Sequence, residues 1–428
     1  MNPKRLPVPV GPYRLFGKTI KACYPLLSPL ARVRRSRLPA ESAIIAVVGS
    51  FGKSTTTRLV RAMLGLEDSL RATKNNGSAA ALAILRLNRE QRIEVLEVEI
   101  NGPGQMESHA RMVSPTAVIV TCIGSEHNRS LKNLETTRHE KAFMVRALPE
   151  DGTAILNGDD PHVTWMATQT RAAIRTFGFG AGNDVRILDS EIDWPNGMRI
   201  RLETRGEKHE FVTRLLGRPG SYAVAAAVAA ADLLNVPIET VKRRVTDFEP
   251  TPGRLEKVHL KDQVYFLRDD FKSGSETIFE SLEVLKSIDV AEKLVVLGEE
   301  TESDMSLHEL YRRIGVEIGA MGARTVFWGS SVRYRDLKRG FAQGGGLVEH
   351  LHRATSFQET VRLAKEEVGS EQVILVKGRI RQRMGRVVLA LQEGRIRCSL
   401  DDCKLKIECS ACPRWFASKR STPVSDAP

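Results

Sequence analysis

The stretch AIIAVVGSFGKSTTTRLVRAML, residues 43–64, decides the fold that the remaining sequence extends. Its apolar run up to Val48 is typical of a buried parallel strand, and the residues from Lys53 onward have a helical pattern. GSFGKSTT, residues 49–56, lies where the strand turns into the helix. Backbone N–H groups at such a turn can bind phosphate oxygens. The stretch therefore predicts a nucleotide-phosphate loop, and the alternative is a glycine turn that only needs positive φ.

The loop contains the candidate nucleotide-binding residues Gly49, Ser50, Gly52, Lys53, Ser54 and Thr55. We expect Lys53 to reach the β and γ phosphates of ATP. A hydroxyl of Ser54 or Thr55 is expected to bind Mg²⁺, which bridges the same phosphates. Val47 stands where the full eight-residue pattern has a glycine, so the loop has the shorter form G-x-x-G-K-[ST].

Strands followed by helical patterns recur along the chain. EVLEVEI ends near Ile100 and TAVIVTCIG ends near Gly124, and residues 184–214 have the alternation of an antiparallel hairpin or small subsheet. EPTPGRLE, residues 249–256, concentrates Pro and Gly and predicts an interdomain hinge. Further strands are expected beyond the hinge at 264–270, 293–299, 324–329 and 372–378.

This alternation predicts an α/β protein with two parallel sheets. The first is a central, P-loop-containing ATPase domain and the second is a Rossmann-like α/β domain. The predicted divisions are a basic N-terminal segment at 1–42, the ATP-binding domain at 43–250, the second domain at 251–395 and a cysteine-rich tail at 396–428.

Positive charge is concentrated at the start of the chain. The formal net charge is +12, and residues 1–40 hold nine Lys or Arg and no acid. A nucleic-acid enzyme would carry basic patches across its folded body, so no nucleic-acid partner is expected. No apolar run is long enough to predict a membrane-spanning helix. Residues 13–38 could lie on an anionic membrane surface, and a plain basic lead-in is the alternative.

Four of the six cysteines fall in the tail, at Cys398, Cys403, Cys409 and Cys412. No signal peptide is recognisable, so a reducing cytoplasmic location is expected and metal ligands are favoured over disulfides. Four thiolates are the number that a closed zinc site needs, although this spacing is not a standard one. An iron–sulfur cluster and unliganded cysteines are the alternatives.

Nine ordered motifs resemble those of the Mur ligase superfamily, which includes the peptidoglycan amino-acid ligases and folylpolyglutamate synthase. The last three are most similar to the group that adds D-alanyl-D-alanine, the MurF-like ligases. The motifs are GSFGKSTT at 49, KNNGSAAALAILRL at 74, VLEVEINGPGQM at 95, CIGSEHNRSLKNLETTRHEKAFM at 122, GTAILNGDDP at 152, PGRLE at 252, DDF at 269, LGEETESDMSLH at 297 and LVKGR at 375.

The resemblance implies an ATP-dependent ligase that activates a carboxylate as an acyl phosphate, joins it to an amino acid or dipeptide and releases ADP and phosphate. Its partners would be small-molecule carboxylates and amines. Glu97 and His127 match the positions that bind a second metal ion, a suitable pair for Mg²⁺ or Mn²⁺. Lys141 matches a lysine that several members carry as a carbamate, with a helix-surface lysine as the alternative.

Three more positions of the family are matched in the second domain. Arg254 matches an arginine that reaches the γ-phosphate, and Lys377 matches a lysine on the acceptor side. Asp269 or Asp270 matches an acid that meets the ribose or orients the lysine. Solvated loop charges are the alternative for each.

Asn157, Asp159 and Asp160 of the first domain follow a strand and fit a structural role and a nucleotide-adjacent role equally.

Two departures from the family pattern limit what the resemblance implies. Gly220 and Ala223 replace two asparagines that help to seat adenosine, and only 42 residues precede the first strand, where the peptidoglycan ligases carry a domain that binds a uridine nucleotide. The carboxylate substrate could therefore lack uridine. A glutamate or amide ligase outside peptidoglycan synthesis, a P-loop ATPase or kinase, and a non-catalytic regulatory subunit are the alternative functions. The oligomeric state is not predicted.

Overall fold

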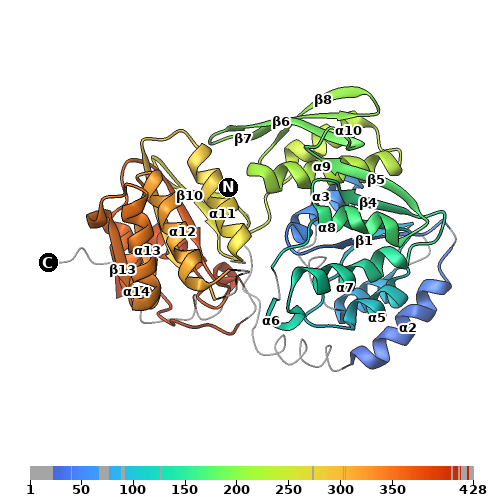
Figure 1. Cartoon of the computed structure of the whole chain (residues 1–428), viewed down its shortest axis with the longest axis horizontal. Coiled ribbons are helices and arrows are strands. Elements are labelled where there is room, and N and C mark those ends of the chain that lie inside the picture. The colour runs from blue at the N-terminus through green and yellow to red at the C-terminus, as the bar shows by residue number, and fades with distance from the viewer. Residues whose placement is uncertain are drawn as a thin grey trace. The chain divides into compact units, whose positions relative to one another are not determined.

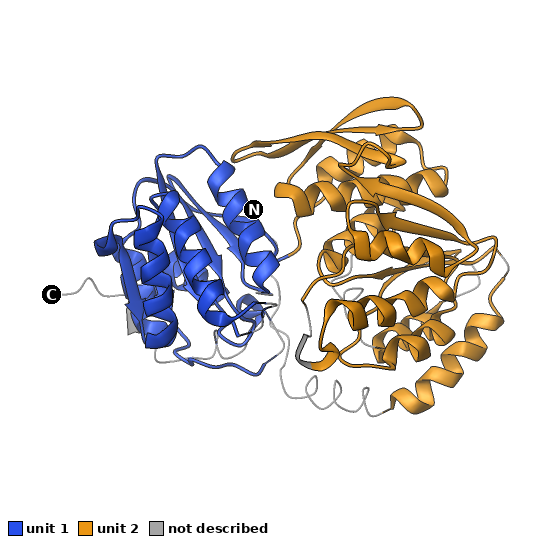
Figure 2. Ribbon diagram, in the orientation of Figure 1, with its two compact units in different colours: residues 1–16, 252–428 blue, residues 17–251 orange. Residues whose placement is uncertain are grey.

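A computed structural model of the chain describes residues 23–39, 41–66, 77–87, 92–125, 128–271, 274–301, 303, 305–405, 408–412, 415 and 422–423. The chain divides into two compact units, residues 17–251 and residues 252–428 together with 1–16 (Figure 2). The division lies between Thr251 and Pro252, inside the predicted hinge. Among the described residues, every helix is too short or too polar to cross a membrane.

The first unit is built on an eight-stranded sheet with the order β2-β1-β3-β4-β5-β6-β7-β8 (Figure 1). Its strands are β1 (Ala43–Val48), β2 (Ile93–Glu97), β3 (Ala117–Val120), β4 (Thr153–Asn157), β5 (Ala173–Gly178), β6 (Val185–Asp193), β7 (Gly197–Thr204) and β8 (Glu207–Thr213). The helical segments are α2 (Tyr24–Ser36), α3 (Lys53–Met63), α4 (Gly77–Arg86), α5 (Gln105–Val113), α6 (Asn128–Leu131), α7 (Leu134–Arg146), α8 (Pro161–Thr164), η1 (Trp165–Gln169), α9 (Gly217–Leu233) and α10 (Ile238–Asp247).

The first six strands are parallel to their neighbours, and β7 and β8 extend the edge in antiparallel fashion. Residues 184–214 therefore form the antiparallel extension that their alternation predicts. A parallel sheet brings the carboxyl ends of its strands to one edge, where ligands of α/β proteins bind.

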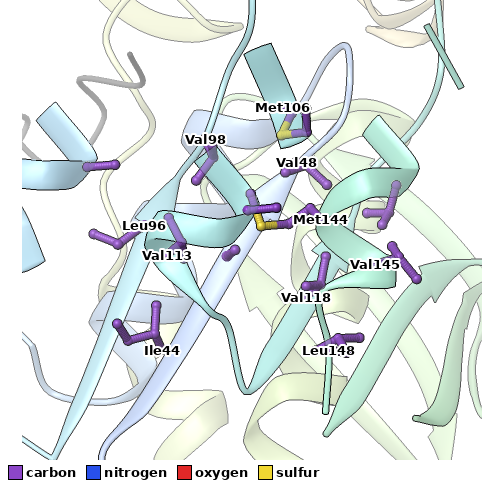
Figure 3. Close-up of a cluster of buried hydrophobic side chains, with 14 of the residues drawn as sticks. Ile44, Val48, Leu96, Val98, Met106, Val113, Val118, Met144, Val145 and Leu148 are labelled. Carbon is purple, nitrogen blue, oxygen red and sulfur yellow. The ribbon is translucent and has the colours of Figure 1, made fainter. Parts of the chain in front are cut away.

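Both faces of this sheet are buried, as a doubly wound fold requires. Along β1, Ile44, Ala46 and Val48 belong to one apolar cluster, whereas Ile45 and Val47 belong to the cluster on the opposite face. Figure 3 shows the first cluster, in which side chains of β1 and β3 meet those of α5 and α7. The alternation of side chains along a strand explains why an unbroken apolar run forms this central strand.

The second unit contains a six-stranded sheet with the order β13-β12-β11-β14-β10-β9, parallel except for the edge strand β9. The strands are β9 (Glu256–Lys261), β10 (Gln263–Asp269), β11 (Glu292–Gly298), β12 (Arg324–Trp328), β13 (Leu351–Ala354) and β14 (Glu371–Lys377), and β15 (Arg395–Ile396) pairs separately with β16 (Thr422–Pro423). The helical segments are α11 (Ser275–Ser287), α12 (Leu307–Ala320), α13 (Ser331–Gln343), η2 (Val348–His350), α14 (Phe357–Glu366), α15 (Gly385–Glu393) and η3 (Cys409–Ala411). Two α/β units confirm the predicted fold class.

Helices α12 and α13 of this unit pack closely because glycines line their contact. A Cβ atom at Gly315 or Gly319 would overlap backbone atoms of α13, and a Cβ atom at Gly340 would overlap the carbonyl oxygen of Arg312 on α12. Backbone therefore lies against backbone along this pair of helices.

The cysteine-rich tail packs on the second unit, although its sequence suggested a segment that stands apart. Ile396, Cys412 and Trp415 are buried in the cluster that covers one face of the second sheet. The Trp415 ring nitrogen donates to Glu393 Oε1 at 2.9 Å. The backbone N–H of Phe357, the first residue of α14, donates to Asp401 Oδ1 at 2.7 Å. Apolar burial and hydrogen bonds therefore fix the described part of the tail.

Candidate functional site

The predicted phosphate loop connects β1 to α3 at the carboxyl edge of the first sheet. Gly49 has a φ of 142° and Gly52 a φ of 80°, so both have backbone conformations that favour glycine. A Cβ atom at Gly49 would also overlap the side chain of Thr121, which follows β3. Gly52 is the N-cap of α3, which begins at Lys53. The two glycines thus allow a tight loop whose N–H groups lie at a helix N-terminus.

Residues that follow β3 hold this loop. The Ser50 backbone N–H donates to the carbonyl oxygen of Cys122 at 2.7 Å, and the Gly124 N–H donates to Ser50 Oγ at 2.9 Å. Thr121 Oγ1 donates to the carbonyl oxygen of Phe51 at 2.5 Å. Thr121 and Cys122 were not predicted as site residues, because contacts between neighbouring strands leave no pattern of residue types in the sequence.

Two lysines converge on the loop from different helices. Lys53 Nζ donates to the carbonyl oxygens of Gly49 and Ser50, both at 2.8 Å. Lys141 Nζ, from α7, donates to the Gly49 carbonyl oxygen at 2.5 Å and to Ser50 Oγ at 3.2 Å. Two residues 88 positions apart in the sequence therefore place their amines at one carbonyl oxygen of the phosphate loop.

Lys141 is buried, with 2% of its surface exposed, so the surface-lysine alternative is wrong. Burial, and next the positive charge of Lys53, hold the pKa of Lys141 well below its usual range. A lysine in this environment favours the neutral amine, which is the nucleophilic form.

Two carboxylates lie at the carboxyl end of β2 and just beyond it. Glu97, the last residue of β2, is buried and pairs in register with Val47 of β1. Glu99 Oε1 lies 3.5 Å from Lys53 Nζ. Glu99 was missed as a candidate, although the alternation Glu97-x-Glu99 was visible in the sequence.

This donor set fits Mg²⁺. Hard carboxylate oxygens and a hydroxyl at the start of α3 are suitable ligands, and Mg²⁺ in nucleotide sites commonly takes only one or two carboxylates plus phosphate oxygens. No group of three or more His, Cys, Asp or Glu in the described part of the chain is arranged to hold a metal ion. His127, the other predicted ligand, lies outside the described residues, and so do residues 74–76 of the second motif.

The three polar residues at the end of β4 and just after it have structural partners. Asn157 Nδ2 donates to the carbonyl oxygen of Thr121 at 2.8 Å, and Asp160 Oδ2 accepts from the Ile123 N–H at 2.7 Å. Both bonds fix the segment that holds the phosphate loop. Asn157 and Asp160 therefore have a structural role beside the phosphate loop.

Asp159 organises a surface at the neighbouring carboxyl end of β5. It accepts from the Phe179 N–H at 2.6 Å and from the Tyr222 hydroxyl at 2.9 Å. The Arg218 guanidinium lies 4.2 Å from the Phe179 ring centroid and donates to the Tyr222 hydroxyl at 2.8 Å. Burial, and then the bond to Asp159, raise the pKa of Tyr222 to about 12. Two aromatic rings and a guanidinium thus stand beside the helix start where the family pattern has asparagines.

In the second unit, Lys377 forms a buried ion pair at the carboxyl end of β14. Its Nζ lies 2.5 Å from Asp269 Oδ2, at the end of the adjacent strand β10, and 3.1 Å from Thr277 Oγ1. Ser281 Oγ also donates to Asp269 Oδ2 at 2.6 Å. Burial is the largest influence on Lys377 and lowers its pKa. Asp269 is therefore the acid that orients this lysine.

Asp270 and Arg254 have different surroundings in the same unit. Asp270 is buried, and its two oxygens accept from Arg268 Nε at 2.6 Å and from the Gly385 N–H at 2.7 Å. Both oxygens of Asp270 thus have hydrogen-bond partners inside the second unit, and its predicted nucleotide contact gains no support. Arg254 lies over the ring of Phe271, with its guanidinium carbon 4.5 Å from the ring centroid.

The predicted zinc site in the tail gains no support either. All four tail cysteines are free, and they are not gathered into a metal-binding group among the described residues. Arg386 Nη1 lies 3.4 Å from Cys398 Sγ. Burial raises the pKa of Cys409 to about 12.

Comparison with known proteins agrees with this geometry. Residues 47–231 match the family model described as the Mur ligase middle domain. The chain is 24% identical over 359 residues to the UDP-N-acetylmuramoyl-tripeptide--D-alanyl-D-alanine ligase of Bacillus subtilis (strain 168), covering 82% of this chain and 76% of the relative.

Solved structures share the fold. A crystal structure of MurF from Acinetobacter baumannii has a TM-score of 0.74 at 20% identity, covering 86% of this chain and 80% of that one. The MurF ligase of Thermotoga maritima in complex with ADP has a TM-score of 0.73 at 18% identity, covering 86% and 83%.

Proposed function

The chain belongs to the Mur ligase superfamily and is an ATP-dependent ligase that forms a C–N bond, and from this premise we propose how its residues work and which substrates it takes. It is MurF-like. The proposed reaction joins an amino acid or dipeptide to a carboxylate acceptor and releases ADP and phosphate. The convergence of Lys53 and Lys141 on the phosphate loop carries this assignment.

The chemistry follows from the need to activate a carboxylate in water. A carboxylate oxygen of the acceptor attacks the γ-phosphorus of ATP, the bond to the β–γ bridging oxygen breaks, and ADP leaves. The amine nitrogen then attacks the carbonyl carbon of the acyl phosphate. The resulting tetrahedral species loses inorganic phosphate and a proton from nitrogen, which gives the amide.

Positive charge at the loop suits the first of these steps. Lys53 at the start of α3 would bind the β and γ phosphates and stabilise the charge that the leaving ADP acquires. Glu97 and a hydroxyl of Ser54 or Thr55 would hold Mg²⁺, which supplies charge neutralisation across the two phosphates. Glu99 would keep the Lys53 ammonium oriented, since it lies within ion-pair distance.

Lys141 is suited to become a carbamate. Its neutral amine would attack carbon dioxide, forming an N–C bond and releasing a proton, and the product is an anion. The positive charge of Lys53 favours both the neutral amine and the anionic product, since the first avoids a like charge and the second gains an opposite one.

We propose that the adenine base lies against Phe179 and Tyr222. Three strand spacings separate β1 from β5, about 14 Å at about 4.8 Å per spacing, which is a suitable separation for the two ends of an extended ATP molecule. An aromatic face stacks on any base, so this seat does not need the side-chain amides that Gly220 and Ala223 lack.

The second unit is proposed to act on the activated acceptor. Lys377, held by Asp269, would carry positive charge toward the acyl phosphate, and Arg254 would add a second charge. Relatives are named for a UDP-N-acetylmuramoyl-tripeptide acceptor and D-alanyl-D-alanine. We propose the same chemical classes here, namely a peptide-bearing carboxylate and a dipeptide amine, used in cell-wall synthesis in the cytoplasm.

The test is release of phosphate from ATP and Mg²⁺ across a panel of carboxylate acceptors paired with amino acids, dipeptides and ammonium. We expect release only when one acid and one amine are present together. Lys53→Ala should abolish it, and Lys208→Ala, at an exposed lysine on β8, should not change it. Mass spectrometry would identify the amide.

Each other outcome has a definite meaning. Release that needs only one substrate would indicate a kinase or ATPase. A pair without a peptide-bearing acid would indicate an amide ligase outside peptidoglycan synthesis. Nucleotide binding without release for any pair would identify a regulatory subunit.

A further inference from the structure

Helix α2 carries apolar side chains on two opposite faces. Tyr24, Leu27 and Ala31 pack into the core of the first unit. On the outer face, Leu26 is 70% exposed, Leu30 58% and Val33 47%. Their spacing of four and three residues aligns the three side chains in one stripe along the helix. Folding requires only the inner face, so the outer stripe needs another explanation.

The inner face attaches α2 firmly to the neighbouring helices α4 and α5. Arg35 Nε donates to the carbonyl oxygen of Ser114 at 3.1 Å, and Arg34 donates to the carbonyl oxygen of Leu87. The Tyr24 hydroxyl lies 3.2 Å from Ser108 Oγ. The stripe is thus presented by a helix with a fixed place at the periphery of the first unit (Figure 1).

Charge around the stripe has a single predominant sign. Helices α2, α4 and α5 and the C-cap of α2 contain one acid, Glu107, and six arginines, namely Arg32, Arg34, Arg35, Arg37, Arg86 and Arg111. Arg32 and Arg37 are exposed beside the stripe. In the sequence, residues 1–40 contain nine basic residues and no acid. An occupant of this face must therefore combine negative charge with an apolar surface.

We propose that the outer face of α2 docks on an anionic lipid surface. Leu26, Leu30 and Val33 would enter the boundary between headgroups and acyl chains, while Arg32 and Arg37 bind lipid phosphates. A short apolar stripe or a basic cluster alone binds a bilayer weakly, and the two together give stable attachment. The attachment is independent of the ligase chemistry.

Co-sedimentation of the full chain with vesicles tests this attachment. Wild type should bind phosphatidylcholine vesicles that contain phosphatidylglycerol, and binding should weaken in high salt and on vesicles of phosphatidylcholine alone. Leu26→Asp with Leu30→Asp keeps every cation and should lower the partition coefficient at least about tenfold. Leu347→Asp with Val348→Asp, at two exposed apolar positions of the second unit, is the matched control and should bind as wild type does.

Other results would overturn the proposal. Equal binding of the α2 variant and wild type would show that the stripe does not meet lipid. Failure of the wild type to bind anionic vesicles would show the same. Concentration-dependent dimers that only the α2 variant abolishes would assign the stripe to a second copy of the chain. Thermal unfolding and phosphate release, both unchanged in the α2 variant, would establish that the variant is folded.

Discussion

Lys141 allows stability and catalysis to be separated at the level of one residue. In the folded chain its pKa lies well below the ordinary value, so the unfolded chain holds more protons between the two values. Stability of the wild type should therefore rise with pH over that range. Lys141→Met removes an amine that must lose its proton when the chain folds, so it should stabilise the chain at neutral pH by about 1–3 kcal/mol, remove this rise and abolish amide formation. Urea unfolding at several pH values measures the stability and its pH dependence. A destabilised variant would contradict this account.

Lys377 and Asp269 form a pair whose two roles can also be separated. Lys377→Met leaves a buried carboxylate without its cation and should cost about 3–5 kcal/mol of unfolding free energy. Adding Asp269→Leu should restore most of that stability but none of the activity. Recovery of amide formation in the double variant would show that Lys377 has only a structural role.

Phe179 tests the proposed seat of the adenine base. Phe179→Ala removes a ring on which a base can stack and should raise the KM for ATP about tenfold with a smaller effect on kcat. Phe143→Ala, which removes a partly buried ring from α7, serves as the comparison. Equal effects of the two substitutions on KM would contradict the seat.

The residues that could be predicted are those whose chemical role follows from their type and their order in the sequence. The glycines and lysine of the phosphate loop were found because a strand, a turn and a helix can be recognised locally, whereas Lys141 was found through its match to a position of the family. Glu99, Thr121 and Cys122 were missed, since they meet the loop through tertiary packing of β2 and β3 against β1. The Phe179, Tyr222 and Arg218 surface was missed for the same reason, because Phe179 and Arg218 are 39 positions apart in the sequence.

At the level of elements, His109 couples pH to the packing of α2, α4 and α5. It is buried on α5 against Tyr24, and burial lowers its pKa to about 4 from an ordinary 6.5. Between these values the unfolded chain binds the proton and the folded chain does not, so stability should fall as pH drops. The loss attributable to His109 should be on the order of 3 kcal/mol, since one pKa unit corresponds to about 1.4 kcal/mol.

His109→Gln cannot titrate and should lack this part of the pH dependence. His139→Gln, at a half-exposed histidine on α7, should retain it. Chemical unfolding between pH 7 and about pH 4 measures the difference. Parallel pH profiles for His109→Gln and wild type would contradict the assignment.

The tail shows what the spacing of cysteines could not predict. Four cysteines suggested a metal, whereas burial of Trp415 and Cys412 attaches the segment to the second sheet. Spacing alone could not distinguish these cases, because both a zinc site and a packed segment place cysteines near one another. The strands β9 and β13 were also missed, since β9 alternates at a sheet edge and β13 has only four residues.

At the scale of the whole molecule, Trp415 predicts how the second unit melts. Trp415→Ala should lower the midpoint of that unit's thermal transition by on the order of 10 °C, because it removes a fully buried ring. An ATP analogue with Mg²⁺ should raise the transition of the first unit, which holds the phosphate loop. Differential scanning calorimetry resolves both shifts. If a zinc chelator destabilised the wild type as strongly as Trp415→Ala does, that result would support a zinc site in the tail.

The glycines between α12 and α13 have a consequence for how this sequence can vary. Gly315, Gly319 and Gly340 lie where even one added carbon would meet main-chain atoms of the facing helix. Alignments and saturation mutagenesis should therefore find these glycines as intolerant of substitution as Lys53, although their proposed role involves no substrate. Invariance in the second unit is thus a poor guide to catalysis unless helix separation is considered first, and a substitution survey of this enzyme must be interpreted with that geometry in view.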